Sequence, residues 1–411
     1  MKVYAESYGC TLNTAENESL ASGLQAMGLK LVKKPENADL IILGTCTVIE
    51  TTERHMIARI KKLQEFKKIL VITGCMAAAQ PELVRKHAPN AFLLPPGQYS
   101  KILQVLGLGK KELLLEPKVN DVVAPIPIAT GCTGSCSYCI TRIARGKIRS
   151  VPVEELKREV ALCVQKGAKE IRLTAQDTAA YGADIGSNLA SCIKEIVHVR
   201  GEFRLRVGMM NPKNVVPILD TLISAYTHRK VFKFLHLPIQ SGSDRILAEM
   251  HRNHTVEDFL TIVRRFREKF RKFTLSTDII VGYPTEDDED FEASVRLIER
   301  VKPDIVNVTR FSARPGTPAA KLKPIPERIV KERSRSLVAL RFQISRKNLE
   351  RRVGTTEKVL VCERGKKGTF IARTTDYKPV VIEERATLGS FVKVKVVGAT
   401  DIYLMGKVIW V

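Results

Sequence analysis

A short apolar run followed by a helical pattern recurs along most of the chain, and this alternation restricts the fold more than any other sequence feature. Near the N-terminus the apolar runs are KVYAESYGC, ADLIILGTC and KKILVITGC. Uninterrupted apolar strands that alternate with helices indicate a parallel sheet covered by helices on both faces. In the first helix we expect Asn13 and Glu16 to form an N-terminal cap. Residues 1–112 are therefore predicted to form an α/β domain.

The same alternation continues through a central region, residues 122–345. Its predicted strands are APIPIATG, EIRLTAQD, RLRVGMMN, FKFLHLPIQ, LSTDIIVGYP and IVNVTRFSA, with helices such as VEELKREVALCVQKG between them. These strand–helix units predict an incomplete TIM-like barrel of the (β/α)6 kind, because a full barrel has about eight strands. An open wall would admit a large substrate. The charged segment GKKELLLEPKVNDVVAP, residues 109–125, is expected to link the two regions.

The last part of the chain changes in character. A strongly basic helical stretch, residues 321–352, precedes the short β runs KVLVCER, GTFIARTTDYKPVVIE, FVKVKVVGA and YLMGKVIWV. Such runs predict a small antiparallel β-barrel, which we assign to residues 350–411. The expected fold class is thus α/β: an N-terminal parallel-sheet domain, a partial (β/α) barrel and a small C-terminal β-barrel.

The charge balance points to a polyanionic partner. The chain has 67 Lys and Arg against 44 Asp and Glu, a formal net charge of +23, which favours RNA or DNA over a role in solubility alone. It has no apolar run of about 18 residues or more, and MKVYAESYGC lacks the apolar core of a secretory signal. We therefore expect a cytoplasmic protein with no membrane partner, in which 9 cysteines indicate metal binding or catalysis rather than disulfides.

Three cysteines share one context in the first domain. Cys10, Cys46 and Cys75 each end a predicted strand, next to a glycine or a glycine–threonine pair. Parallel strands end at the same edge of a sheet, where ligands bind, so these thiols are expected to converge. Three separate buried thiols are the alternative. Zinc with a water ligand and a 4Fe–4S cluster with one open iron both suit three cysteines.

A second triplet, Cys132, Cys136 and Cys139, follows the first strand of the predicted barrel in the stretch GCTGSCSYC. The spacing CxxxCxxC, with aromatic Tyr138 before the last cysteine, resembles that of the radical S-adenosylmethionine (SAM) enzymes. The resemblance implies that the three cysteines hold three irons of a 4Fe–4S cluster and that SAM chelates the fourth. Reductive cleavage of SAM would then give a 5′-deoxyadenosyl radical. A structural zinc knuckle with a remote fourth ligand is the alternative.

Taken together, the two triplets resemble those of the methylthiotransferases, and the resemblance covers essentially the whole chain. Matching stretches are ATGCTGSCSYCITRIARGKIRS, LTAQDTAAYG, HLPIQSGSDRILAEMHRNHT, DIIVGYPTEDDEDF and FSARPGTPA. The family joins a three-cysteine domain, a radical SAM barrel and a C-terminal TRAM domain. It implies two 4Fe–4S clusters, the first carrying an extra sulfide. One SAM would methylate that sulfide, and a second would supply the radical that opens a C–H bond of the substrate.

Four polar residues are candidates for binding SAM. Gln176 and Asp177 end the second barrel strand and Gln240 follows the fourth, at the edge where barrel active sites lie. Capping of the strand ends is their alternative role. Arg252 in MHRNHT is a candidate for the SAM carboxylate or for a helix surface. Tyr138 is included because of the family pattern.

Members of this family modify different substrates, and charge favours tRNA here. The resemblance is greatest to archaeal and eukaryotic enzymes that add a methylthio group to C2 of N6-threonylcarbamoyladenosine beside the anticodon. Isopentenyladenosine tRNA and an aspartate of a ribosomal protein remain alternatives, as does a non-catalytic iron–sulfur RNA-binding protein. An electron donor of the flavodoxin or ferredoxin kind and a sulfur donor are implied partners. Arg142 and Arg314 are candidates to meet the threonyl carboxylate. The residues expected to bind RNA are Arg364, Lys366, Lys367, Arg373, Tyr377, Lys378, Lys393 and Lys395.

Overall fold

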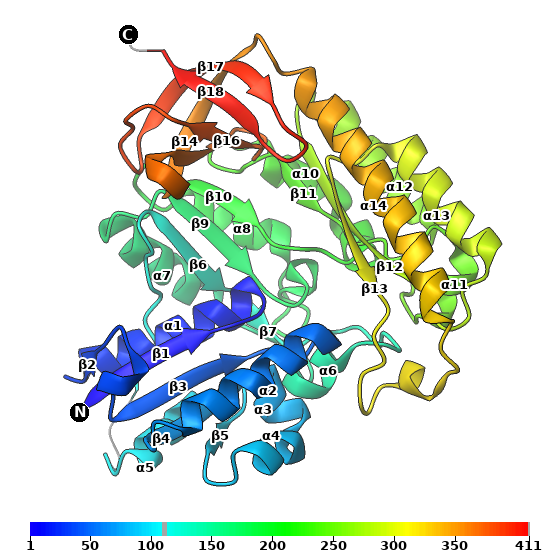
Figure 1. Ribbon diagram of the computed structural model, residues 1–411. Coiled ribbons are helices and arrows are strands. Elements are labelled where there is room, and N and C mark those ends of the chain that lie inside the picture. Colours follow the sequence, from blue (N-terminus) through cyan, green and yellow to red (C-terminus); the bar gives the residue numbers. More distant parts are fainter. Residues whose placement is uncertain (109–112, 410–411) are drawn as a thin grey trace.

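The computed structural model describes residues 1–108 and 113–409, which form three successive parts along the chain (Figure 1). The first part contains a parallel sheet of strand order β2-β1-β3-β4-β5. Its strands are β1 (Lys2–Ser7), β2 (Lys30–Leu31), β3 (Leu40–Thr45), β4 (Ile69–Gly74) and β5 (Phe92–Leu94). Its helices are α1 (Thr11–Ala26), α2 (Glu50–Gln64), α3 (Cys75–Ala79), α4 (Pro81–His87) and α5 (Ile102–Val105), with short 3₁₀ turns at Pro35–Asn37 and Tyr99–Lys101.

The central strand β3 explains why the apolar run is unbroken. All of its residues are buried. Ile41 and Leu43 belong to the hydrophobic cluster on one face of the sheet, and Leu40 and Ile42 belong to the cluster on the other face. Successive side chains of a strand point to opposite faces, so a strand covered by helices on both sides must be apolar at every position.

The middle part is the expected six-stranded partial barrel. Two parallel three-stranded sheets, β10-β9-β6 and β11-β12-β13, are joined by a parallel bridge between Leu205 and Val231. Within the described residues, β6 pairs only with β9 and β13 only with β12, so the barrel is open between β6 and β13. The strands are β6 (Val123–Pro127), β9 (Glu170–Thr174), β10 (Arg204–Val207), β11 (Phe234–His236), β12 (Thr274–Val281) and β13 (Ile305–Arg310).

Helices cover the outside of this barrel. A small hairpin of β7 (Ala129–Thr130) and β8 (Arg149–Ser150) flanks α6 (Ile140–Arg145). The other helices are α7 (Val153–Gln165), α8 (Leu189–Val197), α9 (Pro212–Val215), α10 (Leu219–Tyr226), α11 (Asp244–Glu249), α12 (Val256–Lys269), α13 (Asp288–Val301) and the long α14 (Glu327–Glu350), with 3₁₀ turns at Thr178–Ala180, Val216–Ile218 and Pro318–Lys321. None of the helices that the structure describes has both the length and the apolarity needed to cross a bilayer.

The C-terminal part is a closed barrel of order β14-β15-β16-β18-β17. It is antiparallel as expected, except that β16 and β18 pair in parallel. The barrel packs at the N-terminal ends of the central strands: the Lys233 N–H donates to the Thr375 carbonyl at 3.0 Å. It therefore closes the end of the central barrel that lies away from the N-terminal domain (Figure 1). Its elements are β14 (Thr356–Arg364), a 3₁₀ turn Lys366–Gly368, β15 (Phe370–Thr374), β16 (Pro379–Ile382), β17 (Phe391–Ala399) and β18 (Leu404–Val408).

Three expectations need correction or fall outside the described residues. The predicted cap at Asn13 and Glu16 is wrong, because α1 begins at Thr11 with Cys10 as its capping residue and no side-chain cap. Residues 109–112, which hold the expected end of the first domain and the start of the linker, lie outside the described residues. The same is true of the last two residues of YLMGKVIWV.

Candidate metal centres

The first cysteine triplet lies along one edge of the N-terminal sheet. Cys10 follows β1, Cys46 follows β3 and Cys75 is the first residue of α3, directly after β4. Since β1, β3 and β4 are neighbouring parallel strands, all three thiols come to the same carboxyl edge. Cys46 and Cys75 are buried and Cys10 is exposed.

Two glycines allow the strand ends that carry the cysteines to approach one another closely. Gly9 has a φ of +111°, and a Cβ there would lie 2.8 Å from Cys46 Cβ and 3.2 Å from Cys46 Sγ. Gly74 has a φ of +85°, and a Cβ there would lie 2.4 Å from the Thr45 carbonyl oxygen. Any larger residue at either position would push the strand ends apart. The two glycines therefore bring Cys10 and Cys75 close to Cys46.

An arginine from the central domain reaches into this first triplet. Arg145, the last residue of α6, donates from Nε to Cys75 Sγ at 3.4 Å and from Nη2 to Asn13 Oδ1 at 3.3 Å. It also forms a two-pronged ion pair with Glu16 at 2.7 and 2.8 Å. Burial raises the pKa of the Cys75 thiol to about 11, and the Arg145 charge opposes that shift. Asn13 and Glu16 are thus part of the contact between domains and not a local cap.

The second triplet occupies the loop between β7 and α6, at the carboxyl end of the central strands. Cys139 is the residue that precedes α6. A Cβ at Gly134 would lie 3.3 Å from Cys132 Sγ and 3.8 Å from Cys136 Sγ, so these two sulfurs face the same small space. The Gly134 N–H donates to Cys132 Sγ at 3.2 Å. Burial raises the pKa of Cys132 to about 11.

A second arginine approaches this triplet. Arg252 lies 3.6 Å from Cys136 Sγ through Nη1, and its Nη2 donates to the Pro238 carbonyl at 2.8 Å. Its Nε is buried without a hydrogen-bond partner among the described residues. Unlike Arg145, Arg252 forms no ion pair with any described carboxylate at 4.0 Å or less. Its charge is therefore free to meet an anion.

The other residues expected to bind SAM differ in how many of their polar groups already have hydrogen-bond partners within the protein. Asp177 accepts from the Ala179 and Asn211 N–H groups at 3.0 Å each and from Asn214 Nδ2 at 2.7 Å, which is the capping role. Gln240 adopts a φ of +77°, and its backbone bonds to β12. Gln176 Oε1 is buried without a partner among the described residues. Tyr138 packs beside the cluster of Ile246, Met250, Tyr283 and Ala319.

Sequence reasoning missed two residues that support the second triplet. Asn214 Nδ2 joins Asp177 to Thr133 Oγ1, at 3.2 Å, and so ties the cysteine loop to the strand ends. Ser137 is buried, donates to the Glu249 carbonyl at 2.9 Å and lies 3.0 Å from the Tyr283 hydroxyl. No local sequence signal identifies either residue, whereas Arg145 stands in a stretch that the family pattern had already marked.

The donor sets fit iron–sulfur clusters. Each site offers three thiols, and glycines keep space beside the sulfurs clear. Among the residues described, no group of three or more His, Cys, Asp or Glu side chains is arranged to hold a metal ion. That finding concerns a single ion, whereas the three cysteines of a cluster each bind a different iron and are spaced more widely. Cys163, Cys192 and Cys362 are buried packing residues.

The expected RNA-binding residues differ in burial and fall into three groups. Arg364, Lys366, Lys367, Lys393 and Lys395 are exposed. Tyr377 and Lys378 are buried, and this disagrees with a role in stacking on a base or tracking phosphates. The ring centroids of Tyr377 and Phe232 are 4.9 Å apart, and Lys378 Nζ lies 2.5 Å from Asp304 Oδ1. Both contacts arise because the C-terminal barrel rests on the central one. Arg373 is half-buried and lies over the Tyr377 ring, at 4.9 Å from its centroid.

The two arginines proposed to meet the threonyl carboxylate also differ. Arg142 is exposed on α6. Arg314 is buried and forms an ion pair with Glu53 of α2 while donating to Thr47 Oγ1 at 3.0 Å. Its charge is therefore used to hold the N-terminal and central domains together, which leaves none for a substrate carboxylate.

Models of known families match three successive stretches of the chain. Residues 2–94 match Uncharacterized protein family UPF0004, residues 126–298 match the Radical SAM superfamily and residues 350–409 match the TRAM domain. A Pyrococcus abyssi protein named "Probable threonylcarbamoyladenosine tRNA methylthiotransferase" is 42% identical over 99% of this chain and 99% of its own length. The human threonylcarbamoyladenosine tRNA methylthiotransferase is 35% identical over 99% of this chain and 72% of its own length.

The chain belongs to this methylthiotransferase family. The resemblance read from the cysteine spacings is thus confirmed, and the relatives do not favour the isopentenyladenosine or ribosomal-protein alternatives. Among solved structures, the radical S-adenosylmethionine methyltransferase TsrM from Kitasatospora setae is similar in fold, with a TM-score of 0.58 at 14% identity over 77% of this chain and 73% of that one. As a methylthiotransferase, the protein places its two cysteine triplets on either side of one domain contact, with α6 between them.

Proposed function

We propose that this methylthiotransferase adds a methylthio group to C2 of N6-threonylcarbamoyladenosine in tRNA. The observation that carries the proposal is the meeting of two three-cysteine sites at a single domain contact, where Arg145 of the central domain touches Cys75 of the N-terminal domain. Replacing hydrogen by sulfur at an unactivated carbon needs both a radical and a sulfur source close to that carbon. Two separate sites that face one contact meet this requirement.

Cys132, Cys136 and Cys139 would hold one 4Fe–4S cluster, and Cys10, Cys46 and Cys75 would hold a second. With SAM bound, the two clusters would supply sulfur and the electron for reductive cleavage of SAM, and SAM would supply the methyl group and the 5′-deoxyadenosyl group. The free charge of Arg252 suits the SAM carboxylate, and the unpartnered Gln176 Oε1 suits a donor group of the same ligand. Asp177, Gln240 and Tyr138 would shape the SAM site by holding the surrounding backbone and packing against it.

The division of the chain supports a role for each part. In this proposal residues 1–112 supply sulfur, residues 122–345 cleave SAM and residues 350–411 bind tRNA. The exposed cations Arg364, Lys366 and Lys367 lie together at the end of β14 and would follow the phosphate backbone. An electron donor of the flavodoxin or ferredoxin kind and a separate sulfur donor would complete the reaction.

Mass spectrometry of nucleosides tests the proposal directly. The anaerobically reconstituted protein is incubated with SAM, a reductant, sulfide and tRNA that carries N6-threonylcarbamoyladenosine. We expect that nucleoside to gain one sulfur and one methyl group, and a Cys75→Ala variant to leave it unchanged. A Cys163→Ala variant is the matched control, because that thiol is buried in helix α7 and far from both triplets in sequence.

Two outcomes would contradict the proposal in different ways. Formation of 5′-deoxyadenosine with no change to the nucleoside would mean that the radical chemistry is right and the substrate is wrong. A product that appears equally with the Cys75→Ala variant would remove the N-terminal triplet from the reaction.

A further inference from the structure

The end of the central barrel that the C-terminal domain closes is lined by arginines. Tyr377 forms the floor there: its ring lies 4.9 Å from Phe232 and 5.0 Å from Phe234, and its hydroxyl donates to Glu170 Oε1 at 2.6 Å. Arg206 of β10 lies over the Phe234 ring, 4.9 Å from its centroid, and 5.7 Å from that of Tyr377. A polar and aromatic floor thus closes the barrel where a purely structural seal would be apolar.

The strand register directs these arginines into the barrel. Arg206 is paired in register with Arg172 on the neighbouring strand β9. The residues that alternate with them, Leu205 and Val207 on β10 and Ile171 and Leu173 on β9, belong to the hydrophobic core outside the barrel. Because side chains alternate along a strand, both guanidinium groups must point to the inside.

The charges around this floor do not balance. Arg172 pairs with Glu170 at 2.6 Å and with Glu363 at 2.9 Å, and Arg373 lies 3.7 Å from Glu363. Arg206 has neither an ion pair nor a hydrogen bond to any described residue, and its Nε is buried without a partner. Three guanidinium groups therefore face two carboxylates, which leaves Arg206 as the uncompensated charge.

An uncompensated cation inside a protein is costly unless something offsets it. A guanidinium cannot lose its proton to avoid the cost, because its pKa is too high. The contacts with Phe234 and Tyr377 offset part of it through their ring faces. Glu170 and Glu363 are shared with Arg172 and Arg373, so among the described residues these three arginines still lack one anion.

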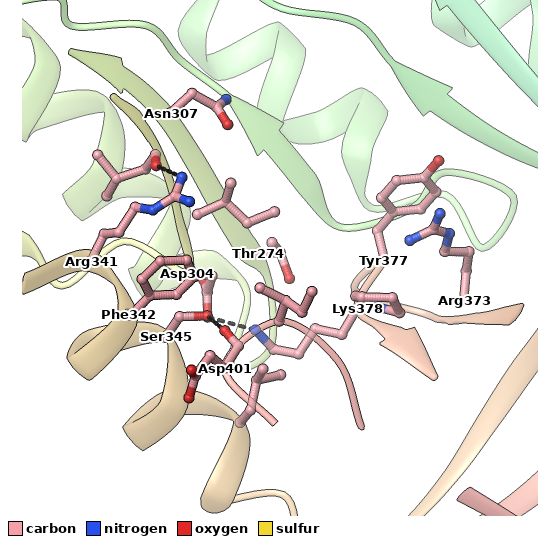
Figure 2. Close-up of a pocket in the computed structure, with 15 residues that line it drawn as sticks. Thr274, Asp304, Asn307, Arg341, Phe342, Ser345, Arg373, Tyr377, Lys378 and Asp401 are labelled. Atoms are coloured by element: carbon pink, nitrogen blue, oxygen red, sulfur yellow. Dashed lines mark hydrogen bonds and ion pairs between the residues drawn. The ribbon is translucent and has the colours of Figure 1, made fainter. Parts of the chain in front are cut away.

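A solute can reach this floor. The side chains of Arg172 and Arg373 keep 22% and 19% of their exposure. A cavity of about 300 Å³ lies between β13, α14 and the C-terminal barrel, and both Arg373 and Tyr377 line it. In Figure 2 the Arg373 guanidinium lies beside the Tyr377 ring, at the end of the cavity opposite Arg341 and Phe342.

We propose that Arg206 binds the carboxylate of the threonylcarbamoyl group, with Arg373 as its neighbour at the same floor. The inference rests on the proposed function, since that substrate is the source of the carboxylate. C2 of the base must face the N-terminal domain that supplies sulfur. The N6 substituent leaves the ring at C6, on the other side of N1, so its bond diverges from the C2–H bond and the group extends away from the N-terminal domain, toward the end that the C-terminal domain closes. A backbone phosphate of the tRNA would satisfy Arg206 by the same chemistry, so the two sources must be separated by experiment.

Binding to two tRNAs separates them. One tRNA carries N6-threonylcarbamoyladenosine at the target position and the other carries unmodified adenosine. The variants are Arg206→Met, which removes the charge, and Arg206→Lys, which keeps it without the planar fork. Arg335→Met is the matched control, because it removes the same charge from an exposed position on α14.

We expect wild type to bind the modified tRNA more tightly than the unmodified one. Arg206→Met should weaken only the modified tRNA, by about 10- to 100-fold, the worth of a hydrogen bond between charged groups. Arg206→Lys should retain part of that preference, and Arg335→Met should affect both tRNAs equally. Iron content and SAM cleavage in the absence of tRNA should match wild type in all three variants.

Two results would overturn the inference. Equal weakening of both tRNAs by Arg206→Met would assign Arg206 to a phosphate, and no change with either tRNA would make it a structural residue. A wild-type protein that prefers the modified tRNA through Arg206 yet fails to methylthiolate it would contradict the proposed function and leave this inference standing.

Discussion

The two cysteine triplets are alike in having an arginine beside one thiol, and they differ in what else that arginine touches. Arg145 beside Cys75 is fully paired with Glu16 and comes from another domain. Arg252 beside Cys136 belongs to the same domain as its triplet, and within the described part of the chain its side chain bonds only to the Pro238 carbonyl and the sulfur. An arginine whose charge is already balanced can hold a domain contact in place. An arginine without a carboxylate can take part in binding a negatively charged ligand.

The largest expected effect is that variants of the two triplets lose different products. Cys132→Ala should abolish formation of 5′-deoxyadenosine, because it removes a ligand of the site proposed to bind SAM. Loss of a cluster ligand should cost more than the roughly 10- to 100-fold lost when a residue supporting a ligand is changed. Cys75→Ala should still form 5′-deoxyadenosine and should lose only the methylthio product. Chromatography of 5′-deoxyadenosine beside nucleoside mass spectrometry measures both. If both variants lose 5′-deoxyadenosine, the triplets do not have separate roles.

Removal of Arg145 should destabilise the protein more than removal of Arg252. Arg145→Met leaves the Glu16 carboxylate partly buried without its partner, a change that typically costs about 3–5 kcal/mol. A double variant, Arg145→Met with Glu16→Gln, should recover part of that loss. Thermal unfolding of the apoprotein measures the effect without any contribution from bound iron. A melting temperature that is unchanged in Arg145→Met would mean that this ion pair does not hold the domains together.

Removal of Arg252 should instead act on SAM. Arg252→Met should raise the KM for SAM by about 10- to 100-fold, because a hydrogen bond to a charged group contributes about 1.5–3 kcal/mol. Arg252→Lys should keep part of the affinity, and Arg145→Met should leave the KM for SAM close to its normal value. Uncoupled SAM cleavage without tRNA is the measurement. Equal effects of Arg145→Met and Arg252→Met on this KM would erase the distinction between the two arginines.

The smallest expected effect concerns the loop that carries the second triplet. Asn214→Ala removes the bond to Thr133 and one of the bonds to Asp177, each worth about 1 kcal/mol. SAM cleavage should fall by a few fold. Iron content is measured in a background that carries Cys10→Ala, Cys46→Ala and Cys75→Ala, so that it reports on the second triplet. Adding Asn214→Ala to this background should leave the iron content near that of the parent. A complete loss of iron in this background would show that Asn214 is needed to form the site and not only to position it.

The fold was predictable because its signals are local. The apolar run of β3 is set by burial on both faces, and the strand ends place Cys10, Cys46 and Cys75 at one edge. The spacing of Cys132, Cys136 and Cys139 is a property of one short loop. These features depend on residues that are close in the sequence, so a sequence pattern contains them.

The contacts between domains were not predictable for the opposite reason. Asn13 and Glu16 have the spacing of a helix cap, but a buried arginine from 129 residues farther along is the partner of Glu16. Tyr377 and Lys378 have the composition of an RNA-binding surface, yet they meet Glu170 and Asp304 when the C-terminal barrel docks. Which surfaces meet depends on the whole fold, and no single stretch of sequence encodes it.

Helix α6 fixes the separation between the second cysteine triplet and the arginine that contacts the first one. Cys139 stands immediately before its first residue and Arg145 is its last, so one rigid segment of six residues, about 9 Å long, connects the two triplets. The separation between Cys139 and the arginine that contacts Cys75 is thus fixed by fewer than two turns of helix. Insertion of one residue into α6 would rotate Arg145 around the helix axis by about 100°. Both cysteine triplets would keep their residues, but Arg145 would no longer point toward Cys75.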